Sequence, residues 1–336
     1  MEPSQDGDQM PLVSVVIPTM GRWQWLRQAV QSVLSQTYRN CEVVVVDDTP
    51  DGYVGRAWSF EWGLQGSERV RLIRSGGVGG GAARNAGVET ARGQWIAFLD
   101  DDDEWMPEKL EKQMQAALLS DGFPVMSCRV KVKTPRSEYV FPRRIYRGDE
   151  SIAEYLFCRK GWVTGSGFMQ TSTLLAPRML LLRTPFNAGL AAHQDWDWLL
   201  RVSREPGVSV GMLEEPLTLY RTGDGRETVS RRPDWRFSLN WIRGHAASIE
   251  PEAVSWFIAV ECVWKARAAH ASRRDWAEIA WAFFCEGEPT VRAMAQFAVF
   301  AAVPVAWRKG IRDLMWRKRC GSQRQMGRQE WRLVSR

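Results

Sequence analysis

The chain has 336 residues, of which 45% are hydrophobic and 25% are charged, so it has the composition of a globular protein with room for one large or two smaller domains. This composition excludes a disordered or fibrous protein. The formal net charge is +6, and residues 305–336 hold ten Lys or Arg against two acidic residues, so the excess positive charge lies in the C-terminal tail.

Cysteine usage and hydropathy indicate the compartment. Six cysteines are scattered without a Cys-x-x-Cys pair, mostly in apolar segments, which favours free thiols over disulfides or zinc. The first ten residues lack a hydrophobic stretch of signal-peptide length, and the longest nearly apolar segment, 293–307, is shorter than the ~20 residues that span a bilayer. We therefore expect a cytoplasmic protein, peripheral on the inner membrane at most.

The first part of the chain alternates strand and helix patterns. Strands are predicted at 13–18, 41–46, 70–73 and from Trp95 to Leu99, with helices at 25–34 and 82–90 between them and a glycine turn at 76–81. This βαβ order predicts a parallel sheet with right-handed crossovers.

Two of these strands end in acidic residues, Asp47-Asp48 and the run from Asp100 to Asp103. Ligands of open α/β sheets bind at the carboxyl edge, so both groups are expected to face one pocket, where carboxylate oxygens suit Mg²⁺ or Mn²⁺ escorting a phosphate. The alternative is a solvated turn before the helix that begins near Pro107, and Asp103 fits the role of its cap.

The remaining elements are predicted in the following order. After the acid run come a helix at 109–119, a strand at 125–132, an antiparallel excursion at 139–146, a helix at 152–157, a glycine-rich loop at 161–167, a strand at 168–175, a helix from 193 to 202, strands at 208–212 and 217–220, and a basic loop at 221–232. Helical patterns follow at 253–269, 275–284 and 291–316. We therefore divide the chain into a disordered N-terminus (1–11), an α/β domain (12–230), a helical extension (231–316) and a basic tail (317–336).

Five segments resemble, in their order and approximate spacing, the motifs of family 2 glycosyltransferases. They are Val13–Thr19, the strand end Val44–Asp48, Ala83–Gly87, Phe98–Asp103 and Gln194–Leu199. The resemblance covers Leu12 to Tyr220. It implies a GT-A fold, which is a Rossmann-like mixed sheet, here with a C-terminal helical extension. It also implies an inverting enzyme that moves a sugar from a nucleotide-diphosphate donor, expected to be a UDP-sugar, to the hydroxyl of a bacterial polysaccharide or glycolipid acceptor.

The resemblance also assigns donor residues. The family's Asp-x-Asp motif matches Asp100-Asp101-Asp102, with Asp102 expected to contact Mn²⁺ or Mg²⁺ and Asp100 to join the metal shell or bind the ribose. Asp101 is assigned to the same donor site. Four strand-end residues match nucleoside-binding positions, namely Pro18, Thr19, Asp47 and Asp48. Arg84 matches a donor-site position, and its alternative is a surface arginine.

The resemblance aligns Asp195 with the base that takes the proton of the acceptor hydroxyl. Gln194 stands where the family often has Glu. The alternative for Asp195 is a helix N-cap. Asp197 is expected to orient the loop or to bind acceptor.

Two other interpretations remain open. The first is an NAD(P)-dependent enzyme, because Gly77 to Ala82 fits Gly-x-Gly-x-x-Ala between a strand and a helix, and Asp100 follows 18 residues later. Against it, this turn is the third strand-to-helix connection of the chain, whereas a dinucleotide site uses the first. The other is a non-catalytic module that binds membrane or nucleic acid through the basic C-terminus, where tryptophans interleave with Lys and Arg. Of these partners we favour peripheral membrane contact through 293–319 and expect no nucleic acid.

Overall fold

A computed structural model describes residues 10–50, 68–135, 137–161, 167–222 and 233–303. Internal contacts divide the chain into two units, 1–156 with 166–231, and 157–165 with 232–336. Most of the predicted disordered N-terminus, the glycine-rich loop at 161–167, the basic loop at 221–232 and the basic tail lie outside the described residues. The predicted division into four segments stays a prediction.

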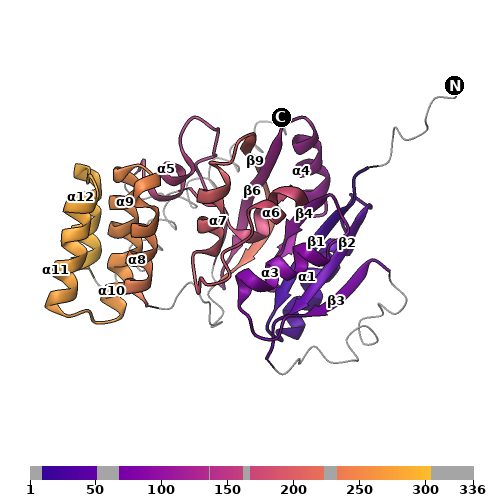
Figure 1. Cartoon of the computed structure of the whole chain (residues 1–336), viewed down its shortest axis with the longest axis horizontal. Helices are drawn as coiled ribbons and strands as arrows, with labels where there is room; N and C mark the ends of the chain where they lie inside the picture. Colours follow the sequence, from indigo (N-terminus) through magenta and orange to yellow (C-terminus); the bar gives the residue numbers. More distant parts are fainter. Residues whose placement is uncertain (1–9, 51–67, 136, 162–166, 223–232, 304–336) are drawn as a thin grey trace, which may run out of the picture. The chain divides into compact units, whose positions relative to one another are not determined.

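The first unit is built on one mixed sheet (Figure 1). Its strands are β1 (Val13–Thr19), β2 (Cys41–Asp47), β3 (Val70–Arg74), β4 (Trp95–Phe98), β5 (Glu104–Trp105), β6 (Phe123–Lys133), β7 (Glu138–Phe141), β8 (Leu175–Pro177) and β9 (Val208–Arg221). They lie in the order β3-β2-β1-β4-β8-β6-β9-β5, with β7 paired to β6. The first four strands are parallel, β8 is antiparallel to β4 and β6, and β6 is parallel to β9. The predicted mixed α/β class is confirmed.

The first unit also contains helices, several of which pack on the sheet. They are α1 (Trp23–Leu34), α3 (Gly80–Thr90), α4 (Lys109–Leu118), α5 (Ile152–Phe157), α6 (Arg178–Arg183) and α7 (Gln194–Val202), with a 3₁₀ turn η1 (Thr171–Thr173). In α1 the buried positions are Leu26, Ala29, Val30 and Val33, one face of a 3.6-residue period.

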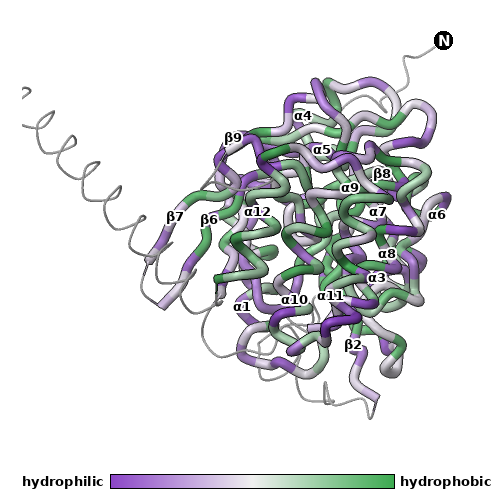
Figure 2. The backbone as a smooth tube through the Cα atoms, turned by 90° about the vertical axis from the view of Figure 1, so that its left-hand side faces the viewer, coloured by the Kyte–Doolittle hydropathy of each residue, from purple (hydrophilic) through white to green (hydrophobic). Residues whose placement is uncertain are grey.

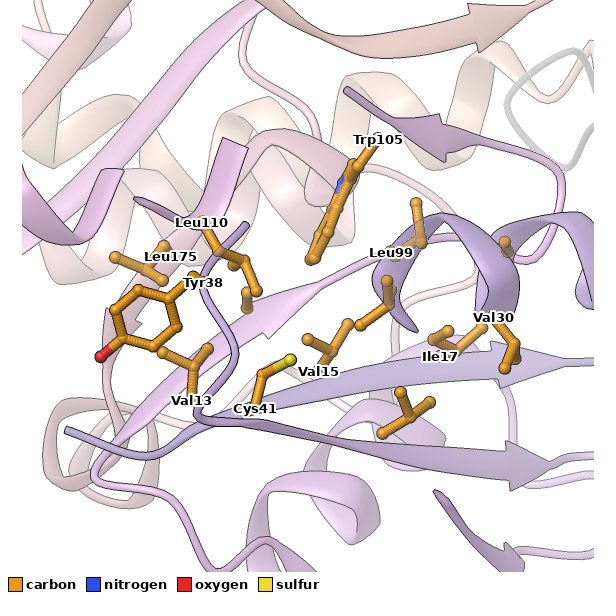
Figure 3. Packing of buried hydrophobic residues seen from close by; sticks show 14 of the residues in the cluster. Val13, Val15, Ile17, Val30, Tyr38, Cys41, Leu99, Trp105, Leu110 and Leu175 are labelled. Atoms are coloured by element: carbon orange, nitrogen blue, oxygen red, sulfur yellow. The ribbon is translucent and has the colours of Figure 1, made fainter. Parts of the chain in front are cut away.

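β1 is buried along almost its whole length because the sheet is covered on both faces. Val13, Val15 and Ile17 project to one face, where they meet Val30 of α1 and other buried apolar side chains (Figure 3). On the other face α3 lies so close to β1 that a Cβ on Gly87 would stand 2.3 Å from a Val16 methyl group. This two-sided core makes the carboxyl ends of β1, β2 and β4 a rigid platform.

The second unit is helical in the part that the structure describes. It contains α8 (Trp235–His245), a 3₁₀ turn η3 (Ala246–Ser248), α9 (Pro251–Phe257), a π-helical turn η4 (Ile258–Cys262), α10 (Val263–Ala268), α11 (Arg273–Trp281), a second π turn η5 (Ala282–Glu286) and α12 (Val291–Ala302). Its core includes the aromatic cluster of Phe157, Trp241 and Phe257, with ring centroids 5.1 to 6.3 Å apart. Phe157, the last residue of α5, therefore packs with these helices.

Several predicted elements differ from the structure. The predicted strand at 168–175 is wrong over most of its length, because η1 occupies 171–173 and β8 begins only at Leu175. The two strands predicted at 208–212 and 217–220 are one strand, β9, whose register against β6 shifts near Arg129 and so accommodates the intervening Glu-Glu-Pro sequence. The two-residue β5 and the helices α6 and α8 were not predicted, and α12 ends at Ala302.

Five cysteines fall within the described residues and all are free, four of them buried and Cys285 exposed. None of the described helices combines the length and the hydropathy that crossing a bilayer requires.

Candidate active site

The four aspartates after β4 have different surroundings. Asp101 and Asp103 are buried, whereas the side chains of Asp100 and Asp102 are 29% and 15% exposed. The run is therefore two inward carboxylates alternating with two that reach the carboxyl edge of the sheet.

Asp101 is held by the last residue of β1 and by a residue of the turn that follows this strand. Its Oδ2 accepts hydrogen bonds from Thr19 Oγ1 at 2.6 Å and from Arg22 Nε at 3.1 Å, and its Oδ1 pairs with Arg22 Nη2. Burial raises the pKa of Asp101 to about 6, although the Arg22 charge opposes the rise. This carboxylate faces inward, and the assignment of Asp101 to the donor site stays a prediction.

Arg22 is a site residue that sequence reasoning missed. It is the N-cap residue of α1, after a turn in which Gly21 has a φ of 79°, and its Nη1 donates to Asp102 Oδ2 at 3.0 Å. Burial alone would lower the pKa of Arg22, but Asp101 and Asp102 raise it. Its contacts lie about 80 residues away in the chain, and its only sequence signal is its place at the end of the turn that follows β1.

Asp103 lies against the η1 turn. Its Oδ2 accepts from Ser172 Oγ at 2.7 Å and from Gln170 Nε2 at 2.9 Å, and its Oδ1 is buried without a hydrogen-bond partner among the described residues. Burial and the neighbouring Asp102 and Asp100 raise the pKa of Asp103 well above its ordinary value. The predicted helix-capping role is wrong, because the N-cap of α4 is Glu108.

Arg84 joins the acid run to α7. From the buried start of α3, its Nη2 donates to Asp100 Oδ1 at 2.6 Å and its Nη1 to Gln194 Oε1 at 2.8 Å. The alternative of a surface arginine is wrong, since the side chain is 10% exposed. One guanidinium thus connects the end of β4 with the first residue of α7.

Asp195 is the second residue of α7 and lies near Arg84 and Asp100. Its Oδ1 accepts the Trp196 backbone N–H at 3.0 Å. Burial raises the pKa of Asp195 to about 6, against the opposing effects of this N–H and the Arg84 charge. The N-cap alternative is wrong because His193 occupies that position, with a φ of 62°.

Asp197 faces another direction from Asp195. It is buried, and its Oδ2 accepts from Arg201 Nε at 2.8 Å, one turn along the same helix. This ion pair holds the Asp197 carboxylate against its own helix, and the expected role of Asp197 in orienting the loop or binding acceptor stays a prediction.

Aromatic packing fixes α7 on the sheet. Trp198 stacks on Phe186 with ring centroids 5.5 Å apart, and Phe186 meets Phe98 of β4 edge to face at 5.2 Å. Trp198 Nε1 also donates to the Thr184 carbonyl at 2.8 Å. The second tryptophan of the Gln194–Leu199 motif therefore anchors the helix that carries Asp195.

The Asp48 carboxylate is bound by the glycine turn at 76–81. Its Oδ1 accepts from Ser75 Oγ and from the N–H groups of Gly77 and Val78, and its Oδ2 accepts from the Gly79 N–H, at 2.8 to 3.0 Å. The N–H groups that would bind a pyrophosphate in a dinucleotide site are thus already bound to a carboxylate. The NAD(P) interpretation of Gly77 to Ala82 is therefore wrong for this turn.

The other predicted nucleoside residues lie at the ends of β1 and β2. Asp47 is buried and its Oδ1 accepts from the backbone N–H and the hydroxyl of Thr49. Pro18 is partly buried, and the Thr19 carbonyl accepts the Asp48 N–H at 2.8 Å. Thr19 therefore links the two acidic strand ends, through its backbone to Asp48 and through its hydroxyl to Asp101.

The acid run offers carboxylate oxygens at the edge of the sheet, where a divalent cation could bind. No group of three or more His, Cys, Asp or Glu side chains within the described residues forms a complete metal site. Magnesium sites of phosphate-transfer enzymes use one or two carboxylates and complete their shell with substrate phosphates and water. Asp100 and Asp102 fit such a site, and Asp102 would exchange its Arg22 contact for the cation.

Comparisons with known proteins agree with this arrangement. Residues 14–172 match the sequence model of Glycosyl transferase family 2. The amylovoran biosynthesis glycosyltransferase AmsB of Erwinia amylovora is 28% identical over 236 residues, covering 68% of this chain and 76% of that protein. The putative teichuronic acid biosynthesis glycosyltransferase TuaG of Bacillus subtilis is 36% identical over 107 residues, covering 31% of this chain and 41% of that protein.

A solved structure shares the fold. Residues 1–349 of S. aureus TarS, in complex with UDP-GlcNAc, superpose with a TM-score of 0.52 at 14% identity, covering 89% of this chain and 92% of that one. This likeness confirms the expected GT-A fold with its helical C-terminal region. Residues 14–172, just under half of the chain, match the family model and the relatives are named glycosyltransferases, so the comparisons support a transferase of glycosyltransferase family 2.

Proposed function

We propose that the chain is an inverting glycosyltransferase that moves a sugar from a nucleotide-diphosphate donor to an acceptor hydroxyl. The observation that carries this proposal is the Arg84 guanidinium, which binds both Asp100 and Gln194 and so holds Asp195 near the acid run. Inversion at the anomeric carbon requires a carboxylate separate from the groups that hold the leaving diphosphate. Asp195 is such a carboxylate, on a different element from Asp100.

The chemistry assigned to Asp195 is that of a general base. The acceptor oxygen forms a bond to the anomeric carbon and gives its proton to Asp195, while the bond from that carbon to the phosphate oxygen breaks and its electron pair leaves with the nucleoside diphosphate. A pKa of about 6 leaves Asp195 ionised at neutral pH and more basic than an ordinary carboxylate.

The donor side is assigned to the acid run and the neighbouring strand ends. Asp100 and Asp102 would hold Mn²⁺ or Mg²⁺, which when bound neutralises the leaving diphosphate. Asp100 is also proposed to meet the ribose, and Arg84 adds a fixed positive charge. The nucleoside is proposed to lie at Pro18, Thr19, Asp47 and Asp48, where Asp48 would exchange one of its four donors for a base N–H.

Similar proteins support the substrate classes. The UDP-GlcNAc bound to S. aureus TarS supports a UDP-sugar donor. The names of AmsB and TuaG refer to the biosynthesis of amylovoran and teichuronic acid, which supports a polysaccharide or glycolipid acceptor for this chain.

The test is hydrolysis of a panel of nucleotide sugars with Mn²⁺, followed by transfer assays with the donor that is found. Asp195→Ala should abolish transfer and leave donor binding intact, whereas Asp102→Ala should weaken metal-dependent donor binding. Asp121→Asn, an exposed acid after α4, serves as the control and should be unchanged. Full activity in either test variant would refute the role assigned to that residue.

We also propose peripheral contact with an inner membrane surface through residues 293–319. The described part of this segment lies in α12, whose tube is largely hydrophobic in Figure 2. Met294 and Val299 are 40% and 48% exposed there, and residues 304–319 lie outside the described residues. Changing both side chains to Glu should reduce flotation of the protein with anionic liposomes, and unchanged flotation would contradict the proposal.

A further inference from the structure

Arg22 binds two neighbouring carboxylates of the acid run with different nitrogens. Nε and Nη2 form a side-on fork on Asp101, and Nη1 donates to Asp102 Oδ2 at 3.0 Å. The two carboxylates differ in exposure, since the Asp101 side chain is fully buried and that of Asp102 is 15% exposed. One arm of the guanidinium therefore reaches inward and the other reaches the edge of the site.

The inward arm is the more firmly fixed. Asp101 is held in addition by the Thr19 hydroxyl at 2.6 Å, and a buried carboxylate that lost its cation would be left with a large desolvation cost. The outer arm makes a single hydrogen bond to a carboxylate that solvent can reach. Breaking the Asp102 contact thus leaves the Asp101 fork intact.

We propose that Arg22 is a built-in counter-ion of the acid run, which occupies Asp102 when no divalent cation is bound and gives up only its Nη1 contact when one binds. This inference rests on the metal role proposed for Asp102. Arg22 acts here as a positioning residue, because it touches the metal ligand and not the reacting atoms.

The consequence is a low affinity for the cation alone. A divalent cation must displace a guanidinium N–H from Asp102 and remain close to the positive charge that stays on Asp101. A nucleoside diphosphate supplies both ligands and negative charge, so cation and nucleotide should each strengthen the binding of the other. Arg22 would in this way make cation binding depend on the presence of donor.

The test is Mn²⁺ binding, followed by the electron paramagnetic resonance signal of free Mn²⁺, with and without UDP. Arg22→Met should bind Mn²⁺ about tenfold more tightly than the wild type in the absence of UDP, because one charge-assisted hydrogen bond no longer competes for Asp102. The same variant should show a smaller gain in Mn²⁺ affinity on adding UDP. The matched control is Arg27→Met, which removes an exposed arginine from the same helix and should bind as the wild type does.

Each result decides the question. Unchanged or weaker Mn²⁺ binding by Arg22→Met, or equal tightening by Arg27→Met, would overturn the inference while leaving the metal role of Asp102 in place. If the wild type with UDP binds no more Mn²⁺ than Asp102→Asn does, the proposed metal role fails and the inference falls with it. Should Arg22→Met not fold, Arg22→Lys tests the same point, since a single ammonium lacks the planar fork that spans both carboxylates and should also tighten Mn²⁺ binding.

Discussion

Replacing Asp195 by Asn should remove activity and stabilise the protein at neutral pH. In the folded chain the pKa of Asp195 rises from its ordinary value of 3.8 to about 6, chiefly through burial. At about 1.4 kcal/mol per pH unit, this rise corresponds to a cost of about 3 kcal/mol for ionising the group in the folded state. Because Asp195 keeps part of its surface in solvent, we expect roughly half of this, about 1.5 kcal/mol, to be observed.

The sign of the effect depends on pH. The folded-state pKa lies above the unfolded value, so the protonated group favours the folded state and this stability is lost as pH rises from about 4 to about 6. Asparagine cannot ionise, so the variant does not lose this stability as the pH rises. Its Tm should therefore be higher than that of the wild type by roughly 3 to 6 °C at about pH 7.5 and hardly different at about pH 4. The assay is thermal denaturation at both pH values, with Asp121→Asn as the control. A lower Tm for Asp195→Asn at neutral pH, or an equal rise at both values, would refute the reasoning.

Three further predictions concern the candidate site and the packing of α3, the helix that carries Arg84. The kcat/KM of the wild type should fall about tenfold per pH unit below about pH 6, because the base must be ionised, and a profile flat down to about pH 5 would exclude Asp195 as that base. Ser172→Ala should lose about 1 to 2 kcal/mol of stability in denaturant titrations and weaken Mn²⁺ binding, since its hydroxyl holds both Asp103 Oδ2 and the Asp100 N–H. Gly87→Ala should cost about 1 to 3 kcal/mol, because its Cβ would stand 2.3 Å from a Val16 methyl group, and an unchanged Tm would show that α3 can move away from β1.

The strands and the motif residues could be predicted because their signals are local. The apolar runs of β1, β2 and β4 and the acids that end two of them are visible in the sequence, and buried parallel strands follow from their two-sided cover. Arg84 was identified through its motif, and the structure shows a contact with Asp100, 16 residues away. The helix carrying Asp195 was likewise predicted close to its observed start.

What the sequence did not show depends on distant contacts. The pairing of Arg22 with Asp101 spans 79 residues and has no periodic signal. The two-residue β5 exists only because it pairs with β9, and no local propensity marks it. Asp103 looked like a helix cap because Pro107 lies near, but Ser172 and Gln170 bind its carboxylate from another part of the chain.

The turn that Asp48 occupies is an anion receptor filled by its own chain. Since Asp48 is attached to the sheet beside the turn, its carboxylate has a far higher effective concentration there than a diffusing phosphate would reach. The turn should therefore reject free anions, although its glycines follow the spacing of a nucleotide site. The hydrogen bond from the Gly79 N–H to Asp48 also connects the end of β2 with the start of α3. It therefore helps to fix the position of Arg84 on that helix. A glycine turn in a related sequence should be compared with the acid that ends a neighbouring strand before a nucleotide is assigned to it.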